Sequence, residues 1–195
     1  MENNNSPKRE QYEQAILTAL GCTAVEGRAH GIVYRLLVSP TFQPVCAFEF
    51  SWSAEAGSFR HAALPTMTDP VSDYIWERSR ATEVSAIEEA MFASVESVTP
   101  IDGEKGHELL QRFAILQRPS VSPEDIAAKD GATIRLDLRD EHGSFTLRAQ
   151  LASTGSSPEL AAWLLAFLTT AREHVHDRRL VDQLKRLPSY FGLGQ

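Results

Sequence analysis

Cysteine is scarce in this sequence, and long hydrophobic runs are lacking. The two cysteines, Cys22 and Cys46, cannot form a disulfide framework and do not have the spacing of metal ligands. The longest apolar run, LAAWLLAFL, is far shorter than the ~20 residues that span a membrane. The opening residues MENNNSPKRE contain no apolar stretch of the signal-peptide kind. We therefore expect a cytoplasmic protein that does not associate with membranes.

An excess of basic residues is lacking as well. The formal net charge is −7, and residues 69–108 carry ten acidic and three basic side chains, which accounts for the whole excess. A nucleic-acid-binding face needs bases that neutralise phosphates. We therefore expect no nucleic-acid partner, and the acidic segment favours a partner protein with a basic surface.

Motifs that carry catalysis or bind cofactors are also missing. The glycines of DGEKGHE have neither the preceding strand nor the Lys-Ser/Thr ending of a phosphate-binding loop. His174 and His176 diverge by about 200° on a helix, so they make a poor metal site. Glu88 and Glu89 are adjacent and do not face one site. The sequence predicts no catalytic, cofactor-binding or metal-ligating residue, and we do not expect an enzyme, although a site assembled only in the fold stays open.

What is present is the composition of a globular domain. The chain has 195 residues, 43% of them hydrophobic, which suits one domain that buries its core without disulfides. We expect a disordered N-terminus over 1–10 and a single α+β domain over 11–195. Within that domain, residues 69–130 read as a mostly helical insertion.

Three stretches are rich in β-branched and aromatic residues and predict strands, namely GIVYRLLVS, VCAFEFSW and SFRHAAL. In the second stretch, alternation places Cys46 on one face with Phe48, Phe50 and Trp52. We therefore expect Cys46 to be a buried and inert thiol.

A hairpin is predicted over residues 134–151, and its register follows from the apolar pattern. Pairing Leu136 with Leu147 also pairs the neighbouring apolar residues and collects them on one face, whereas a slip by one residue would mix the faces. The same register sets Arg135 opposite Arg148, and like charges in that position are destabilising. Asp137 lies close enough to offset this repulsion.

Helical periodicity and capping residues predict the remaining elements. HELLQRFAILQRP fits a helix that passes into a strand, and the acid-faced helix near 83–98 has an apolar stripe. The firmest prediction is a long C-terminal helix that begins at Ser157, changes phase at 176–179 and ends at Pro188. Further helices are expected over 8–20, from Asp69, and in SPEDIAAKDG.

The stretch ATIRLDLRDEHGSFTLRAQLASTGSSPELAAWLLAFLTTAREHV resembles the closing strand-turn-strand-helix of type III secretion chaperones and related small bacterial α+β proteins. That resemblance implies a small acidic protein that holds an extended partner segment, and a homodimer is compatible with it. Small acidic immunity proteins and antitoxins, which block a basic toxin, are an equally serious parallel by role.

The sequence thus predicts an α+β fold, with an antiparallel sheet of about five strands covered by the long C-terminal helix and acidic helices inserted in the middle of the chain. The expected function is non-enzymatic binding of another protein, as an inhibitor or a holding chaperone. The alternatives are a small-molecule-binding α+β domain and an unrecognised enzyme. The residues expected to bind the partner are Glu83, Glu88, Glu89, Glu96, Arg135 and Arg148.

Overall fold

The structure is a computed structural model, and the residues it describes fall into several ranges. These are 13–14, 16–22, 31–40, 44–53, 56–64, 94–119, 131–141, 143–152 and 157–191. The predictions for residues 1–10, for the helix beginning at Asp69 and for SPEDIAAKDG lie outside the described residues. The domain boundaries therefore stay predictions.

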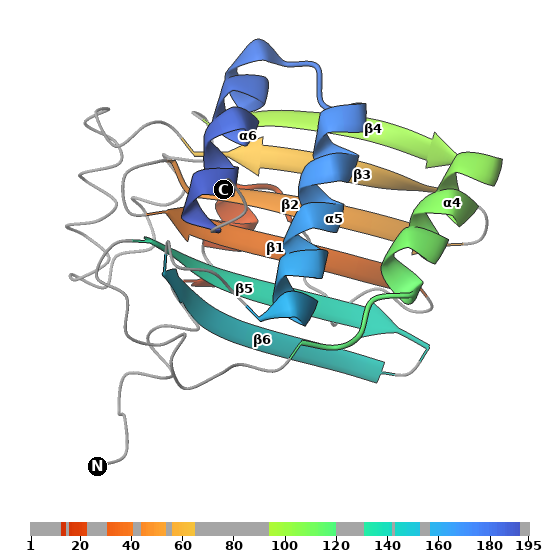
Figure 1. The fold of residues 1–195 in the computed structure, drawn as a ribbon. Helices are drawn as coiled ribbons and strands as arrows, with labels where there is room; N and C mark the ends of the chain where they lie inside the picture. Colours follow the sequence, from red (N-terminus) through yellow and green to blue (C-terminus); the bar gives the residue numbers. More distant parts are fainter. Residues whose placement is uncertain are drawn as a thin grey trace.

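The described residues form a six-stranded antiparallel sheet with the strand order β4-β3-β2-β1-β5-β6 (Figure 1). The strands are β1 (Ile32–Pro40), β2 (Cys46–Ser53), β3 (Ala56–Ala63), β4 (Val95–Asp102), β5 (Gly131–Asp140) and β6 (Gly143–Ala152). The helices are α4 (Gly103–Ala114), α5 (Pro158–His174) and α6 (Arg178–Tyr190). This confirms the α+β class and the antiparallel sheet.

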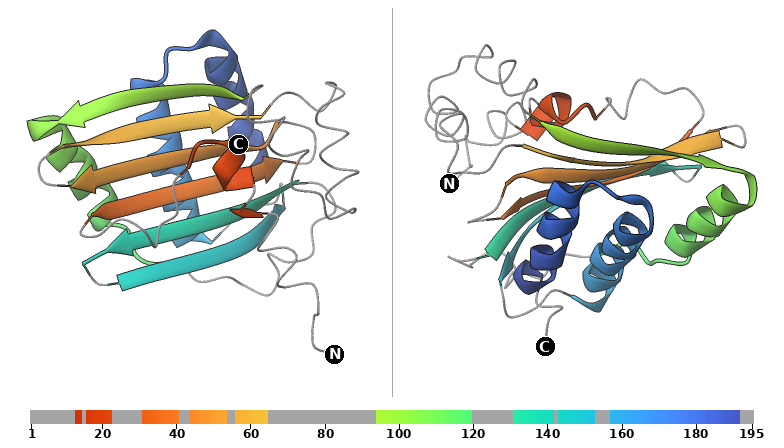
Figure 2. Two further views of the ribbon diagram at one scale, coloured as in Figure 1. Left: turned by 180° about the vertical axis from the view of Figure 1, so that it is seen from behind. Right: turned by 90° about the horizontal axis from the view of Figure 1, so that it is seen from above.

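The sheet has two differently covered faces. Helices α4, α5 and α6 lie across one face, which we call the inner face (Figure 1). A helical segment near the N-terminus, residues 13–14 and 16–19, lies on the opposite side, which we call the outer face (Figure 2). Side chains alternate along each strand, so every strand of the sheet contributes one set of residues to each face.

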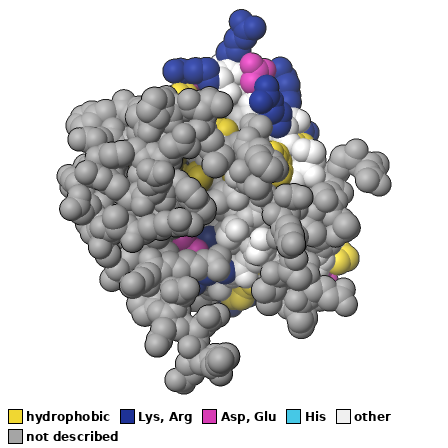
Figure 3. Space-filling model, turned by 90° about the vertical axis from the view of Figure 1, so that its left-hand side faces the viewer, with side chains coloured by type: hydrophobic (Ala, Val, Ile, Leu, Met, Phe, Trp, Pro, Cys, Tyr) yellow, Lys and Arg dark blue, Asp and Glu magenta, His cyan; other side chains and the backbone are white. Residues whose placement is uncertain are grey.

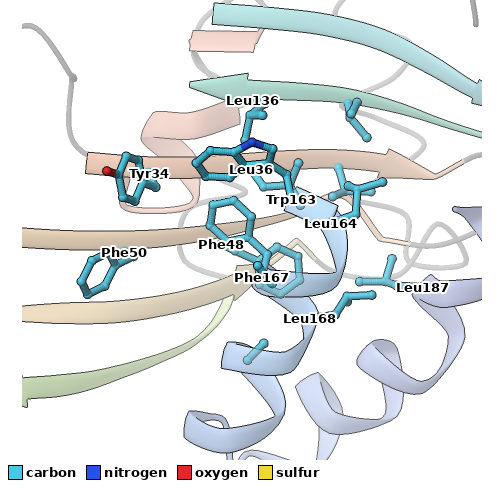
Figure 4. Packing of buried hydrophobic residues seen from close by; sticks show 14 of the residues in the cluster. Tyr34, Leu36, Phe48, Phe50, Leu136, Trp163, Leu164, Phe167, Leu168 and Leu187 are labelled. Atoms are coloured by element: carbon cyan, nitrogen blue, oxygen red, sulfur yellow. The ribbon is translucent and has the colours of Figure 1, made fainter. Parts of the chain in front are cut away.

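The inner face carries the main core. Tyr34, Phe50 and Phe113 lie close together, with Phe113 at 5.3 Å from Tyr34 and 5.7 Å from Phe50 between ring centroids. Trp163 and Phe167 of α5 pack against Phe113. Figure 4 shows Trp163 and Phe167 among the packed side chains of this core. Ring pairs at such distances add to the stability that comes from burying their area. Helix α5 therefore packs on the sheet through aromatic side chains.

The predicted hairpin is confirmed as β5 and β6. Leu136 pairs with Leu147, and Arg135 is directly opposite Arg148. Leu136 and Leu147 are both buried on the inner face, so the apolar pattern did select the register.

The number of strands exceeds the predicted five because β4 was assigned to a helix. The helix expected near 83–98 is wrong for residues 95–98, and the rest of it lies outside the described residues. The spacing of Val95 and Val98 fits a helix, but Val95 and Ile101 also fit the alternation of a strand. Pairing with β3 over eight positions, Ala56–Ala63 with Val95–Asp102, decides for the strand. Pro100 is tolerated because β4 is an edge strand.

Two helix predictions also need correction. The strand expected at the end of HELLQRFAILQRP does not form, since α4 ends at Ala114 and residues 115–119 form a turn and an irregular segment whose Gln117 carbonyl accepts a hydrogen bond from Trp163 Nε1. The C-terminal helix is two helices, separated where the apolar stripe changes phase. Ser157 is its N-cap, as predicted. The helix does not end at Pro188 as predicted, because α6 continues to Tyr190. Pro188 lies in its last turn, where its carbonyl accepts a hydrogen bond from the Phe191 N–H.

Gly106→Ala is expected to destabilise the protein, although alanine favours helices. Gly106 is buried in α4, and a methyl group there would overlap the ring of Trp52. We expect a loss of about 1–3 kcal/mol in the free energy of unfolding, measured by urea denaturation. The double variant Gly106→Ala/Trp52→Leu is the control, because the smaller side chain makes room. A Gly106→Ala variant at least as stable as the wild type would contradict the close packing of α4 on Trp52.

Candidate functional site on the outer face of the sheet

A row of charged side chains crosses the outer face. In the strand register, Glu49 and Asp137 flank Arg35, and Arg60 lies beyond Glu49. The signs alternate along four neighbouring strands, β3, β2, β1 and β5. Directly opposed residues on one face lie close enough for ion pairing. We call Arg60, Glu49, Arg35 and Asp137 the charged row.

Arg35 is the centre of the charged row and is almost fully buried, with 1% of its side chain exposed. Its Nε and Nη2 atoms donate to Glu49 Oε2 at 2.9 Å and 2.6 Å. Its Nη1 atom lies 3.9 Å from Asp137 Oδ2. Removing a guanidinium from water is costly unless such partners compensate for the lost hydration. The two flanking carboxylates therefore make the burial of Arg35 tolerable.

Asp137 links the charged row to the hairpin. Its Oδ1 atom accepts hydrogen bonds from Arg135 Nε at 2.9 Å and from Thr146 Oγ1 at 2.8 Å. Its Oδ2 atom is buried and has no hydrogen-bond partner among the residues that the structure describes. The prediction that Asp137 offsets the charge of the hairpin arginines is thus confirmed for Arg135.

A carboxylate of the N-terminal segment lies between the opposed arginines of the hairpin. We use this name for residues 13–14 and 16–22. Glu13 Oε2 accepts from Arg148 Nε at 2.7 Å and from Arg135 Nη1 at 3.3 Å. Glu13 is itself buried. A carboxylate between Arg135 and Arg148 explains how this register is tolerated, and the carboxylate belongs to the same chain.

The residues expected to bind a partner lie in different places. Arg135 and Arg148 are together on the outer face, with 12% and 33% of their side chains exposed. Glu96 is exposed on the edge strand β4 and forms an ion pair with Arg60. It is therefore separated from the arginine pair by most of the sheet. Glu83, Glu88 and Glu89 lie outside the described residues.

A hollow of about 700 Å³ opens where β4 leads into α4. Its charged and polar lining residues are exposed, and acids outnumber bases among them. The described stretch 94–108 carries four acidic residues and one lysine, so the acidic character predicted for residues 69–108 extends onto this surface. The hollow is lined by Asp102, Glu104, Lys105, His107, Glu108 and Gln111.

Basic side chains gather elsewhere, along α6. Figure 3 shows Lys and Arg side chains clustered at the end of the molecule where α5 meets α6. The exposed bases of α6 are Arg178, Arg179, Lys185 and Arg186. Helix α6 and the acidic hollow lie at opposite sides of the helical layer (Figure 1). The described surface therefore separates charges of opposite sign.

The buried thiols are poorly suited to nucleophilic chemistry. Cys46 is fully buried in the core, as predicted, and burial raises the pKa of its thiol. Burial, reinforced by the nearby Glu49 carboxylate, raises the pKa of Cys22 to about 12. The thiolate is the reactive form of cysteine, and it is scarce at neutral pH when the pKa is raised.

Two buried histidines pack against rings of the core. His61 stacks on Phe48 with 4.4 Å between ring centroids, and burial lowers the pKa of its imidazole to about 3. His174 lies near Phe59, and burial lowers its pKa as well. His174 is therefore a packing residue of the core.

The described ranges contain neither a cluster of metal ligands nor a helix that could span a membrane. Within them, no group of three or more His, Cys, Asp or Glu side chains is arranged to hold a metal ion. No helix in this part of the chain is both long enough and apolar enough to cross a membrane.

Comparison of the chain with protein-family models, with curated proteins and with solved structures finds no match. The resemblance to secretion chaperones therefore stays a prediction.

The sequence carries a signal for the charged row, although no residue of the row was predicted to be buried. Arg35 is the one charged residue in the apolar strand 32–40, and Glu49 is the one charged residue in the strand 46–53. A charge inside an apolar strand is rarely buried without a partner. Two such residues in consecutive strands could have been predicted to pair. Glu13 gave no comparable signal, because its partners lie 122 and 135 residues away.

Proposed function

We propose that this protein is a non-enzymatic protein-binding module of the cytoplasm, which inhibits or holds a partner that presents a basic surface. An immunity-protein-like or secretion-chaperone-like role fits this description. The observation that carries the proposal is the acid-lined hollow between β4 and α4, where Glu104 and Glu108 are exposed. All its lining residues except Gln111 belong to the segment 69–108, which holds the whole net charge of the chain.

The chemistry of the buried groups supports a binding role over a catalytic one. The charges of the charged row are paired within the chain, since Arg35 is paired with Glu49 and Asp137 with Arg135. Arg60 is paired with Glu96 of β4. Catalytic groups usually converge on a cleft with pKa values near the working pH. In the described part of the chain, by contrast, burial moves the pKa values of Cys22 and His61 away from neutrality.

The acidic surface should act mainly on the rate of association. Exposed charges of one sign attract a partner of the opposite sign over several ångströms and raise the encounter rate, and salt screens this effect. We therefore expect steering by Glu104, Glu108 and the acidic residues that precede them in the chain.

The test starts from affinity purification of the tagged protein in its native host and identification of the co-purifying protein. Association of the purified pair is then measured by stopped-flow at 25 mM and 250 mM NaCl. For Glu104→Gln/Glu108→Gln we expect an on-rate about tenfold lower at the lower salt concentration, and nearly equal to the wild type at the higher one. A second variant replaces Glu83, Glu88, Glu89 and Glu96 with glutamine.

The matched control is Asp182→Asn, which removes one exposed carboxylate from α6, away from the hollow. Its on-rate should stay within twofold of the wild type. An on-rate that neither set of glutamine variants changes, with a large loss on replacing Arg135 and Arg148, would refute the acidic surface and assign recognition to the hairpin.

A further inference from the structure

We propose that Arg135 and Arg148 form a carboxylate-binding site on the outer face, and that the N-terminal segment is an exchangeable cap whose Glu13 occupies that site. The inference is independent of the acidic hollow and of the partner proposed for it. The ligand class is a carboxylate carried on a polypeptide.

The arrangement of the arginines is that of a binding site. Arg135 and Arg148 are opposed in register on adjacent strands, so their positive charges face the same space. Glu13 Oε2 receives a hydrogen bond from each of them. Asp137 holds Arg135 from the other side through its Nε atom at 2.9 Å. The guanidinium groups are thus oriented by the sheet and need only a carboxylate between them.

Beyond the contact of Glu13, the N-terminal segment packs on the outer face through an apolar cluster that is separate from the main core. Its apolar residues pack on Leu37, Ala47, Ala62 and Leu64 of the outer face, in a cluster distinct from the aromatic core under α4, α5 and α6. The residues that the segment contributes to this outer cluster are Ile16, Leu17, Ala19, Leu20 and Cys22. The segment can therefore leave the outer face without opening the main core.

The two cysteines lie in different clusters, so the labelling rate of each thiol measures the opening of one cluster. Cys22 ends the N-terminal segment and is buried in the outer cluster, whereas Cys46 is buried in the main core. Labelling of a buried thiol under native conditions requires an opening that exposes it. Lifting of the cap should therefore expose Cys22 and leave Cys46 protected.

The experiment measures labelling of both cysteines of the full chain by mass spectrometry at pH 7.5. In Glu13→Ala we expect Cys22 to label on the order of tenfold faster than in the wild type, because two charge-assisted hydrogen bonds are lost, while Cys46 stays slow. Replacing 200 mM chloride with 200 mM acetate should then slow Cys22 labelling in Glu13→Ala by about fivefold. This is the effect of a ligand with a Kd of about 50 mM that fills the space left by the Glu13 carboxylate only while the segment is seated on the outer face.

Matched variants separate binding at the arginines from general salt effects. Glu13→Gln should label faster than the wild type but show no acetate effect, because its amide fills the space. Glu13→Ala/Arg148→Gln should also lose the acetate effect. If Glu13→Ala does not fold, Glu13→Ser leaves similar room. Equal labelling rates of Cys22 and Cys46 in every variant, or acetate acting no differently from chloride in Glu13→Ala, would overturn the proposal.

Discussion

Replacing Glu49 with leucine is expected to lower the free energy of unfolding by about 3–5 kcal/mol, because Arg35 then stays buried without its main counter-ion. Nε and Nη2 of Arg35 both donate hydrogen bonds to Oε2 of Glu49, at 2.9 Å and 2.6 Å. Asp137 is more distant, at 3.9 Å, and is already engaged by Arg135. It cannot replace Glu49 without a shift of the charged row. The measurement is urea denaturation followed by circular dichroism.

Two controls test the reason for this loss. The double variant Arg35→Met/Glu49→Leu removes the charge together with its partner, so it should be more stable than Glu49→Leu alone. Asp182→Ala breaks the exposed pair with Lys185 on α6, 2.8 Å apart, and should lower the free energy of unfolding far less than Glu49→Leu does. A double variant no more stable than Glu49→Leu would contradict the view that the unpaired buried charge causes the loss.

Stability is expected to fall steeply as the pH drops below 6.5, because His61 resists protonation in the folded protein. Burial lowers its pKa from 6.5 to about 3, although the nearby Gln183 side chain slightly favours the charged ring. Within the described chain, neither ring nitrogen has a hydrogen-bond partner. The unfolded chain therefore takes up a proton near pH 6.5 that the folded protein takes up only near pH 3.

Because the pKa is lower in the folded protein, the contribution of neutral His61 to the free energy of unfolding is complete above pH 6.5. It is lost progressively as the pH falls from 6.5 to 3. The expected slope is about 1.4 kcal/mol per pH unit, or about 2–3 kcal/mol between pH 7.5 and 4.5. Urea denaturation across that range measures it. His61→Leu is the matched control, since it keeps an apolar side chain against Phe48 and cannot titrate. If the variant and the wild type have the same pH dependence, His61 does not bind the additional proton on unfolding.

The hairpin shows how much a local pattern can predict. The alternation of apolar residues in 134–151 was sufficient for the register, because a slip by one residue would have moved Leu136 and Leu147 to different faces. The content of β-branched and aromatic residues located the strands 32–40 and 46–53. Helix α5 was predicted from its N-cap and apolar stripe. The change in phase marks the place where α6 begins, although one continuous helix was predicted.

Strand β4 shows where local patterns fail. Val95 and Val98 match helical spacing, and Val95 and Ile101 match a strand, so the sequence did not discriminate. The unpaired edge of β3 selected the strand, and that edge exists only once the sheet has formed. The strand that was expected after α4 does not form. Residues 115–119 instead place the Gln117 carbonyl on Trp163.

For the candidate site, local sequence patterns were sufficient to predict the opposition of Arg135 and Arg148, the nearness of Asp137 and the concentration of acid in residues 69–108. Tertiary packing selects the carboxylate that lies between the arginines. Glu13 reaches them because the N-terminal segment packs on the outer face through the cluster around Leu37. Contacts over more than a hundred residues leave no periodic trace in a sequence, since they depend on which faces meet after the sheet has formed.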